Sequence, residues 1–220
     1  MSMQAIVNGK EETVLSVAEM RAADAYTIAH FTSSRVLMHR AAEGIYRAAP
    51  SWQGRIAILV GGGNNGGDGY ALACILADAG AAFDLFAVSE KLSEDGAYYR
   101  AQAQAKGARI LPFTEQVHLE GYDILVDCLL GTGFHGPVRG RMRDAIARIN
   151  AARQAGAFVI AADINSGMDG DTGEAECAVS SDLTVSIGYY KTGLLTPAAA
   201  ARIQRLMNVE IGIVLPATKE

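Results

Sequence analysis

The chain has 220 residues, of which 50% are hydrophobic and 20% charged, as in a globular protein with one substantial core rather than a disordered or fibrous chain. Its formal net charge of −5 argues against general nucleic-acid binding, which needs a positive face. The N-terminus shows no signal-peptide pattern and no stretch approaches the roughly 18 apolar residues of a membrane span, so we expect a cytoplasmic protein that contacts neither nucleic acid nor membrane.

The first 50 residues are predicted to form a helical extension. Ser16 and Glu19 have the spacing of a capping box and precede an Ala-rich run over 20–30. A second helix is expected over 34–49, and Pro50, the next residue, ends it. Because these helices precede every expected strand, we expect them to pack on an edge or face of the later sheet, or on a second subunit.

From residue 51 onward, short apolar runs alternate with helical segments. The run 56–60 is continuously apolar, which is typical of a strand buried on both faces. Strands alternating with helices indicate right-handed crossovers and a parallel sheet covered on both sides. The expected strands are 56–60, 83–88, 109–112, 124–126, 158–161, 183–187 and 209–214, and the expected helices between them are 70–79, 93–106 and 141–154.

The sequence therefore predicts a single α/β domain over 1–220. The core, residues 51–220, is expected to be a Rossmann-like three-layer αβα sandwich with a mainly parallel sheet, and residues 1–50 its N-terminal helical extension. In such sheets, ligands bind beyond the carboxyl ends of the strands. Three loops that follow expected strands are rich in polar and glycine residues, and they are the candidates for a binding site.

The first loop, GGGNNGGDG over 61–69, contains a G-x-G-x-x-G pattern between a strand and a helix. Such a loop suits a phosphate, although a tight turn without a ligand explains the glycines alone about equally well. Asn64, Asn65 and Asp68 indicate a more specific role than holding a pyrophosphate. The acidic ribose partner of a dehydrogenase, expected about 20 residues further on, is poorly placed here.

The other two loops each begin with an aspartate. Asp127 ends an apolar strand and precedes a glycine-rich stretch, and Asp163 directly follows another strand. A turn cap explains Asp127 about as well as a functional role does, and 169–173 has the composition of an ordinary turn. A calcium site over 163–171 is discounted because the spacing is not that of an EF-hand.

Together the three loops offer oxygen atoms from Asn65, Asp127 and Ser166 at one edge of the sheet. Oxygen ligands suit a hard cation, and a single carboxylate matches the charge of potassium better than that of zinc. The cysteines and histidines have no zinc-binding spacing. Asp163 would remain free for proton transfer. Lys191 could neutralise a phosphate, but a lone loop lysine is usually solvated, and His135 is likewise interpreted as a surface side chain.

Taken together, these loops resemble the NAD(P)H-hydrate epimerase family, the YjeF N-terminal domain type. The resemblance rests on GGGNNGGDG at 61–69, D-x-L-x-G-T-G at 127–133 with Pro137 after it, and D-I-N-S-G-M-D-x-D-T-G at 163–173. The VAEMRAAD helix start and the SIGYYKTGLL segment add to it, and it covers about 15–214. The family commonly has proline at the positions of Gly62 and Asn165.

The resemblance implies an isomerase of nicotinamide nucleotide repair that interconverts the R and S forms of hydrated NADH and NADPH. It implies that K+ is held by Asn65, Asp127 and Ser166, and that Asp163 is catalytic and contacts the hydrated nicotinamide ring. The substrate-binding residues that it implies are Asn64, Asn65, Gly66, Gly67, Asp68, Gly131, Thr132, Gly133, Phe134, His135, Gly136, Pro137 and Asp163.

The resemblance also bears on partners. Many bacterial relatives carry a dehydratase as a second, C-terminal domain. We expect none here, and we expect a separate NAD(P)HX dehydratase in the same pathway. A homodimer through the N-terminal helices is expected from the family and from the apolar, Ala-rich segment. Two alternatives stay open: a different nucleotide enzyme on the same fold, such as a dehydrogenase, and a non-catalytic nucleotide-binding or scaffold protein.

Overall fold

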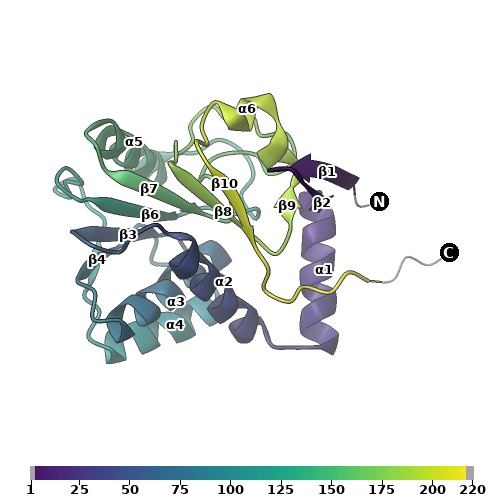
Figure 1. The fold of residues 1–220 in the computed structure, drawn as a ribbon. Coiled ribbons are helices and arrows are strands. Elements are labelled where there is room, and N and C mark those ends of the chain that lie inside the picture. Colours follow the sequence, from purple (N-terminus) through teal and green to yellow (C-terminus); the bar gives the residue numbers. More distant parts are fainter. Residues whose placement is uncertain (1–2, 217–220) are drawn as a thin grey trace.

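The computed structural model describes residues 3–216, which contain a seven-stranded sheet between two layers of helices (Figure 1). The strand order is β10-β8-β7-β6-β3-β4-β5, and every neighbouring pair is parallel. The strands are β3 (Ile56–Val60), β4 (Phe83–Ala87), β5 (Ile110–Pro112), β6 (Ile124–Cys128), β7 (Phe158–Ala162), β8 (Leu183–Ile187) and β10 (Leu206–Val209). The predicted Rossmann-like α/β sandwich is thus confirmed.

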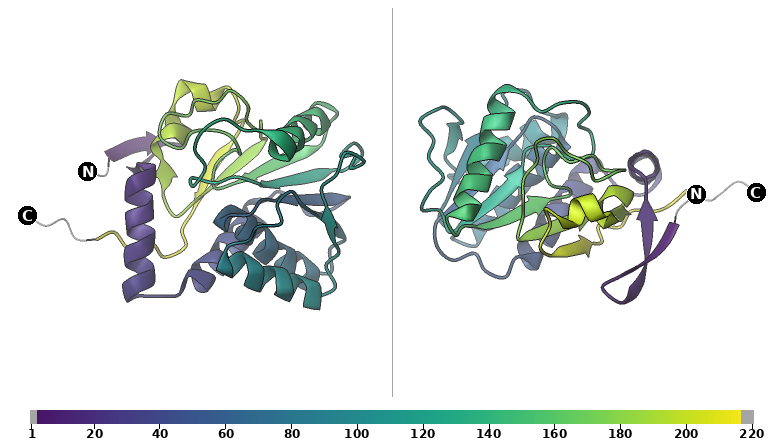
Figure 2. Two further views of the ribbon diagram at one scale, coloured as in Figure 1. Left: turned by 180° about the vertical axis from the view of Figure 1, so that it is seen from behind. Right: turned by 90° about the horizontal axis from the view of Figure 1, so that it is seen from above.

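The two faces of the sheet are covered by different helices, as Figures 1 and 2 show. Alternate residues of β3 enter different cores: Ile58 packs in the core with α2–α4, and Leu59 in the core with α5. This alternation explains why the strand is apolar throughout. The helices are α2 (Ser34–Ala48), α3 (Asn64–Asp78), α4 (Glu94–Ala105), α5 (Gly140–Gln154) and the short α6 (Pro197–Ala200), which follows a 3-10 turn over Thr192–Leu195. Within residues 3–216, none has the length and apolar character needed to cross a membrane.

The N-terminal segment corrects the sequence-based expectation. Strands β1 (Met3–Val7) and β2 (Lys10–Leu15) form an antiparallel hairpin, and β2 also pairs in parallel with β9 (Tyr190–Lys191). The hairpin turn is Asn8–Gly9, with φ of 52° and 79°. An Asn-Gly pair between two strand-like runs is a strong local hairpin signal, and it outweighs the helical interpretation of 3–15.

Helix α1 (Val17–His30) stands apart from the layers, beyond the end of the sheet (Figure 1). Hydrogen bonds to three other segments hold it in place. The backbone N–H of Val17 donates to Asp171 Oδ1 at 2.7 Å, and Arg21 Nη2 donates to the carbonyl oxygen of Thr132 at 2.8 Å. Near its C-terminal end, Thr27 Oγ1 accepts the N–H of Val214 at 2.9 Å. Helix α1 therefore forms a separate wall opposite the loops that leave the sheet.

Several element boundaries refine the expectations. The predicted capping box is present, with Ser16 Oγ accepting the Glu19 N–H at 3.2 Å and Glu19 Oε2 accepting the Ser16 N–H at 2.9 Å. Helix α3 begins at Asn64, six residues before the expected start, so the glycine-rich segment forms its first turn. The low helix propensity of glycine hides this start in the sequence. The expected strand 209–214 instead ends at Val209.

Strands β3 and β6 are sheet neighbours, although β4 and β5 lie between them in the chain. The crossovers therefore run in opposite directions on the two sides of this pair. The point where the strand order reverses opens a crevice outside the carboxyl ends of the strands, where ligands of such folds bind. Asp127 lies at this point, near the end of β6, opposite Leu59 of β3 and Ala161 of β7.

Candidate active site

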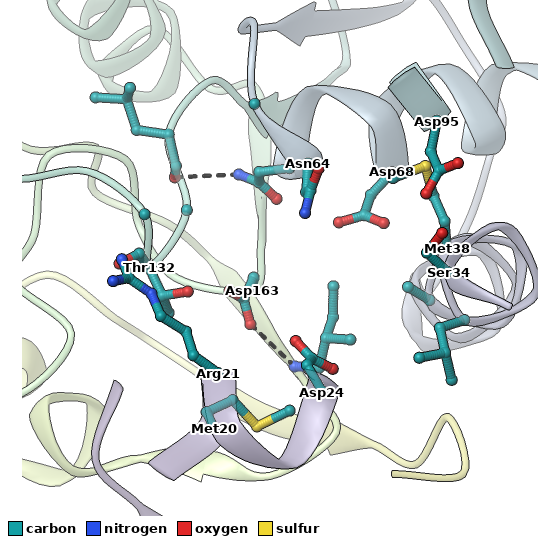
Figure 3. A pocket seen from close by; sticks show the side chains of 18 of the residues that line it. Met20, Arg21, Asp24, Ser34, Met38, Asn64, Asp68, Asp95, Thr132 and Asp163 are labelled. Carbon is teal, nitrogen blue, oxygen red and sulfur yellow. Dashed lines mark hydrogen bonds between the residues drawn. The ribbon is translucent and has the colours of Figure 1, made fainter. Parts of the chain in front are cut away.

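A cavity of about 920 Å³ lies between α1, α2 and the carboxyl ends of the strands (Figure 3). This volume is within the range of about 300–1,000 Å³ that is usual for small-molecule and cofactor sites. Much of the predicted substrate-binding set lines it. The lining members are Asn64, Asn65, Asp68, Gly131, Thr132, Gly133, Phe134 and Asp163.

The remaining predicted substrate-binding residues lie elsewhere. Gly66 and Gly67 are buried in the first turn of α3, and a Cβ on Gly66 would lie only 2.1 Å from the Gly61 carbonyl oxygen. Their place in the structure is thus explained by close packing of the loop. His135 and Gly136 line an adjoining hollow of about 200 Å³, and Pro137 is exposed beside them. Contact of these five residues with a ligand stays a prediction.

Asn65, Asp127 and Ser166 come together behind the cavity wall. Asp127 Oδ1 accepts the Ser166 hydroxyl at 2.5 Å, and Oδ2 accepts the Ser166 N–H at 2.9 Å. The carbonyl oxygen of Leu130 accepts from Asn65 Nδ2 at 3.1 Å and lies 3.1 Å from Ser166 Oγ. Asp127 and Ser166 are fully buried, because Asp127 is flanked by strands on both sides. We call this group the oxygen cluster: Asn65, Asp127, Leu130 O and Ser166.

The oxygen cluster holds a carboxylate without a cationic side chain. Burial raises the pKa of Asp127 to about 6, although hydrogen bonds from Ser166 and Leu129 oppose the rise. Asn65 Oδ1 is buried and has no hydrogen-bond partner within residues 3–216. An unsatisfied buried oxygen beside a buried carboxylate fits a bound cation. Within residues 3–216 there is no group of three His, Cys, Asp or Glu side chains that could hold a metal.

Asp163 occupies a strained backbone position directly after β7. Its φ is 67°, in the left-handed region that residues other than glycine rarely adopt, and its N–H donates to the carbonyl oxygen of Val185 at 2.8 Å. Such backbone strain costs about 1–3 kcal/mol and clusters at functional sites. Asp163 lines the cavity, as Figure 3 shows, and its Oδ1 lies 3.4 Å from the backbone nitrogen of Ile187.

Lys191 holds the Asp163 side chain, so its interpretation as a solvated loop lysine is wrong. Its side chain is 1% exposed, and its ammonium donates to Asp163 Oδ1 and, at 2.7 Å, to the carbonyl oxygen of Ile187. Burying an ammonium is favourable only with such partners. The sequence carries no local signal of this contact, because β9 is placed by its pairing with the N-terminal hairpin.

Two further carboxylates face Asp163, and the sequence analysis missed one of them. Figure 3 shows Asp24 and Asp68 directed into the same hollow as Asp163. Burial, with the nearby charge of Asp163, raises the pKa of Asp24 to about 6, against the opposing effect of Lys191. The same two effects raise the pKa of Asp68 well above its ordinary value. The helical spacing of Met20, Asp24 and Ile28, which all line the cavity, is the signal that would have found Asp24.

The positions where the family commonly has proline are tightly fitted in this chain. A Cβ on Gly62 would lie 2.6 Å from the Lys91 carbonyl oxygen, so the loop after β4 occupies the space of a larger residue. Asn165 is fully buried, with Nδ2 donating to the Val179 carbonyl at 2.9 Å and Oδ1 accepting the Thr184 hydroxyl at 2.6 Å. Hydrogen bonds of the Asn165 side chain thus hold the backbone next to Ser166.

Comparison with known proteins gives consistent matches. Residues 34–193 match the family described as YjeF-related protein N-terminus. An NAD(P)H-hydrate epimerase of Limosilactobacillus fermentum is 34% identical over 206 residues, covering 89% of this chain and 95% of that protein. An NAD(P)H-hydrate epimerase of Rhodopirellula baltica is 38% identical over 181 residues, 80% of this chain and 72% of that protein.

Two other matches differ in kind. A bifunctional NAD(P)H-hydrate repair enzyme Nnr of Coxiella burnetii is 36% identical over 80% of this chain, which corresponds to 37% of that protein. The crystal structure of the yeast protein YNL200c superposes with a TM-score of 0.72 at 18% identity, covering 88% of this chain and 87% of that one. At this identity the yeast structure supports the fold alone.

Proposed function

The chain belongs to the family of the YjeF-related protein N-terminus, and from that premise we propose that it is an NAD(P)H-hydrate epimerase. This isomerase interconverts the R and S forms of hydrated NADH and NADPH. The observation that carries the proposal is the fixed placement of Asp163 by Lys191 in the wall of a cavity of cofactor size. Two relatives that match most of this chain are named NAD(P)H-hydrate epimerases.

The reaction inverts one ring carbon, which bears a hydroxyl group and is bonded to the ring nitrogen. Protonation lets the hydroxyl leave as water while the nitrogen lone pair forms a double bond to that carbon. Water then returns to either face of the resulting cation. Asp163 serves as a proton donor or acceptor, and carboxylates around the cavity stabilise the positive charge of the ring. Opening and reclosure of the ring is a second route to the same inversion.

The loops after β3 and β6 are proposed to bind the dinucleotide. Asn64 and Gly63 lie exposed at the N-terminus of α3, where free N–H groups and the helix dipole favour an anion such as phosphate. Gly131 to Phe134, from the loop after β6, line the same cavity. Arg21 fixes this loop through its hydrogen bond to Thr132.

We further propose that the oxygen cluster binds potassium. The Asn65 side-chain oxygen, the Asp127 carboxylate and the Ser166 hydroxyl would be the ligands, and the unpartnered Asn65 Oδ1 supports this assignment. Bound potassium would balance the charge of Asp127 and fix the three ligand loops relative to one another. The side chains of the cavity, not this ion, carry out proton transfer.

The function is tested with a mixture of hydrated NADH epimers and a dehydratase specific for the S form. Complete consumption of the mixture is expected when this protein is present, because it converts the R form into the S form. A reaction that stalls with the R form left over, at the slow spontaneous rate of epimerisation, would contradict the proposal and favour a non-catalytic binding protein. Asp144→Asn, an exposed position on α5, is the matched control for later Asp→Asn variants.

We also propose a partner enzyme, a cellular location and an oligomeric state for this protein. A separate dehydratase would consume the S form, and the protein would act in the cytoplasm as a homodimer through its N-terminal helices. Sedimentation that shows only particles of single-chain mass at working concentration would remove the homodimer.

A further inference from the structure

Inversion at one carbon makes demands on both faces of the ring. If the hydroxyl leaves from one face, a proton is needed on that side, and when water returns to the other face, a base is needed there. A single carboxylate held on one wall of the cavity serves only the face that it touches. An efficient epimerase of this kind therefore needs a second acid–base group on another wall.

We propose that Asp24 is this second acid–base residue, acting from the α1 wall while Asp163 acts from the edge of the sheet. The inference rests on the proposed function. Met20, Asp24 and Ile28, spaced by four residues, all line the cavity from α1. Helix α1 stands apart from the sheet in Figure 1, and Figure 3 shows the Asp24 and Asp163 carboxylates reaching the hollow from these two elements.

The two carboxylates have different partners, which suits different tasks. Asp163 is paired with the buried ammonium of Lys191. Asp24 is half-buried and has no side-chain hydrogen bond or ion pair with any residue of 3–216. Its pKa, raised to about 6 by burial and by Asp163, lies close to neutral pH, where a group exchanges protons most readily. An unpaired carboxyl group in the cavity wall is thus available to the substrate.

The charged groups around Asp24 are those that would shape its titration. Asp163 and Lys191 face it from the sheet edge, and Asp68 faces it from α3. Arg21, one turn earlier on α1, is engaged with Thr132. Lys91 and Asp95 line the cavity from the loop and helix after β4.

Asp68 is less suited to the same role. Burial and the charges of Asp163 and Asp24 raise its pKa well above the ordinary value, which favours the neutral form of this carboxyl group. A carboxylic acid that stays neutral donates a hydrogen bond but does not alternate between acid and base. Asp68 is therefore the comparison residue for the test.

The proposed step is balanced. Protonated Asp24 gives its proton to the departing hydroxyl, the carbon–oxygen bond breaks, and the ring nitrogen forms a double bond to carbon as water leaves. A second water attacks from the other face, a new carbon–oxygen bond forms, and the proton of that water passes to Asp163. Solvent returns the two carboxyl groups to their starting protonation. In the reverse direction their roles exchange.

The test compares Asp24→Asn, Asp163→Asn, Asp68→Asn and the control Asp144→Asn on each purified epimer in water enriched in heavy oxygen. Epimerisation and incorporation of heavy oxygen at the inverted carbon are both measured by chromatography and mass spectrometry. Asp24→Asn is expected to lower epimerisation about a hundredfold or more. It should still exchange the oxygen of one epimer, namely the one whose hydroxyl faces Asp163. Asp163→Asn should exchange only the other epimer.

The outcomes separate this inference from the proposed function. If the unmodified protein does not interconvert the epimers, the proposed function fails. If it does, but Asp24→Asn epimerises at the unmodified rate, or Asp24→Asn and Asp163→Asn exchange the same epimer, the inference about Asp24 is overturned. The inference would also be overturned if Asp68→Asn, and not Asp24→Asn, exchanged only the epimer that Asp163→Asn does not exchange. Circular dichroism shows that each variant is folded.

Discussion

Asp127 and Asp163 follow neighbouring strands of one sheet, yet their surroundings are opposite. Asp127 is fully buried, accepts hydrogen bonds from Ser166 and the Leu129 backbone, and has no cationic side chain near it within residues 3–216. Asp163 reaches the cavity and is paired with the buried ammonium of Lys191. Of these two carboxylates, residues 3–216 thus supply a cationic side chain to Asp163 alone. This difference supports the two proposals, that Asp127 takes its cation from solution and that Asp163 acts in the chemistry beside a built-in partner.

The largest effect is expected from Asp163→Asn. The amide retains a hydrogen-bond acceptor for Lys191 but can no longer take up a proton, so epimerisation should fall about a thousandfold. Initial rates on the purified R form measure the loss. Normal epimerisation by a folded Asp163→Asn variant would show that Asp163 does not transfer protons. The proposed difference in role between Asp163 and Asp127 would then be wrong.

The Lys191→Met variant tests how much the buried pair of Lys191 and Asp163 contributes to stability. Removing one partner of a buried pair leaves an uncompensated charge, which lowers the free energy of unfolding by about 3–5 kcal/mol. Because Asp163 Oδ1 loses that partner, Lys191→Met combined with Asp163→Asn should recover much of the stability. Urea denaturation of both variants measures the difference. Equal stabilities of the single and double variants would show that Lys191 acts independently of Asp163.

The pH dependence of stability tests whether the Asp127 carboxyl group is buried without a cation beside it. In the folded protein without potassium, the pKa of Asp127 is raised from 3.8 to about 6. A raised pKa contributes stability below pH 3.8 that is lost as the pH rises through about 6. The unfolding free energy of the unmodified protein relative to Asp127→Asn should therefore fall by about 2 kcal/mol from pH 4 to 7. Chemical denaturation in choline chloride measures it. A difference that does not change with pH would contradict the burial of an ionisable, unpaired carboxyl group.

Potassium should reduce this penalty and stabilise the folded protein. At a concentration about 100 times the dissociation constant, a ligand that binds only the folded state adds about 2.7 kcal/mol. The unfolding midpoint should rise when choline is replaced by potassium, and Ser166→Ala should weaken the response because one oxygen ligand is lost. Ser51→Ala, an exposed serine, is the control. If potassium raised the unfolding midpoints of Ser166→Ala and of the control equally, Ser166 would not be a ligand of the ion.

The strand and helix pattern was largely determined by the sequence, because each signal is local. The apolar run of β3, the Ser16 capping box and the glycines that follow the helices specify their elements from neighbouring residues alone. Topology then brings the loops after β3, β6 and β7 to one edge, since parallel strands end on the same side. This rule is sufficient to place Asn65, Asp127 and Ser166 together, and their role as ligands stays a prediction. The Asn8–Gly9 hairpin was equally local, and the sequence analysis overlooked it.

Only the tertiary structure decided which side chains surround Asp163. Lys191 is 28 residues away in the chain and reaches Asp163 because β9 is held by the N-terminal hairpin. Asp24 enters the cavity because α1 is tied to Asp171 and Thr132. Helical spacing puts Asp24 on one face of α1 with Met20 and Ile28, but it does not say what that face meets. The contacts themselves depend on the packing of segments that are distant in sequence. The local pattern therefore determines the sheet and its ligand edge, whereas long-range packing sets the charges that act there.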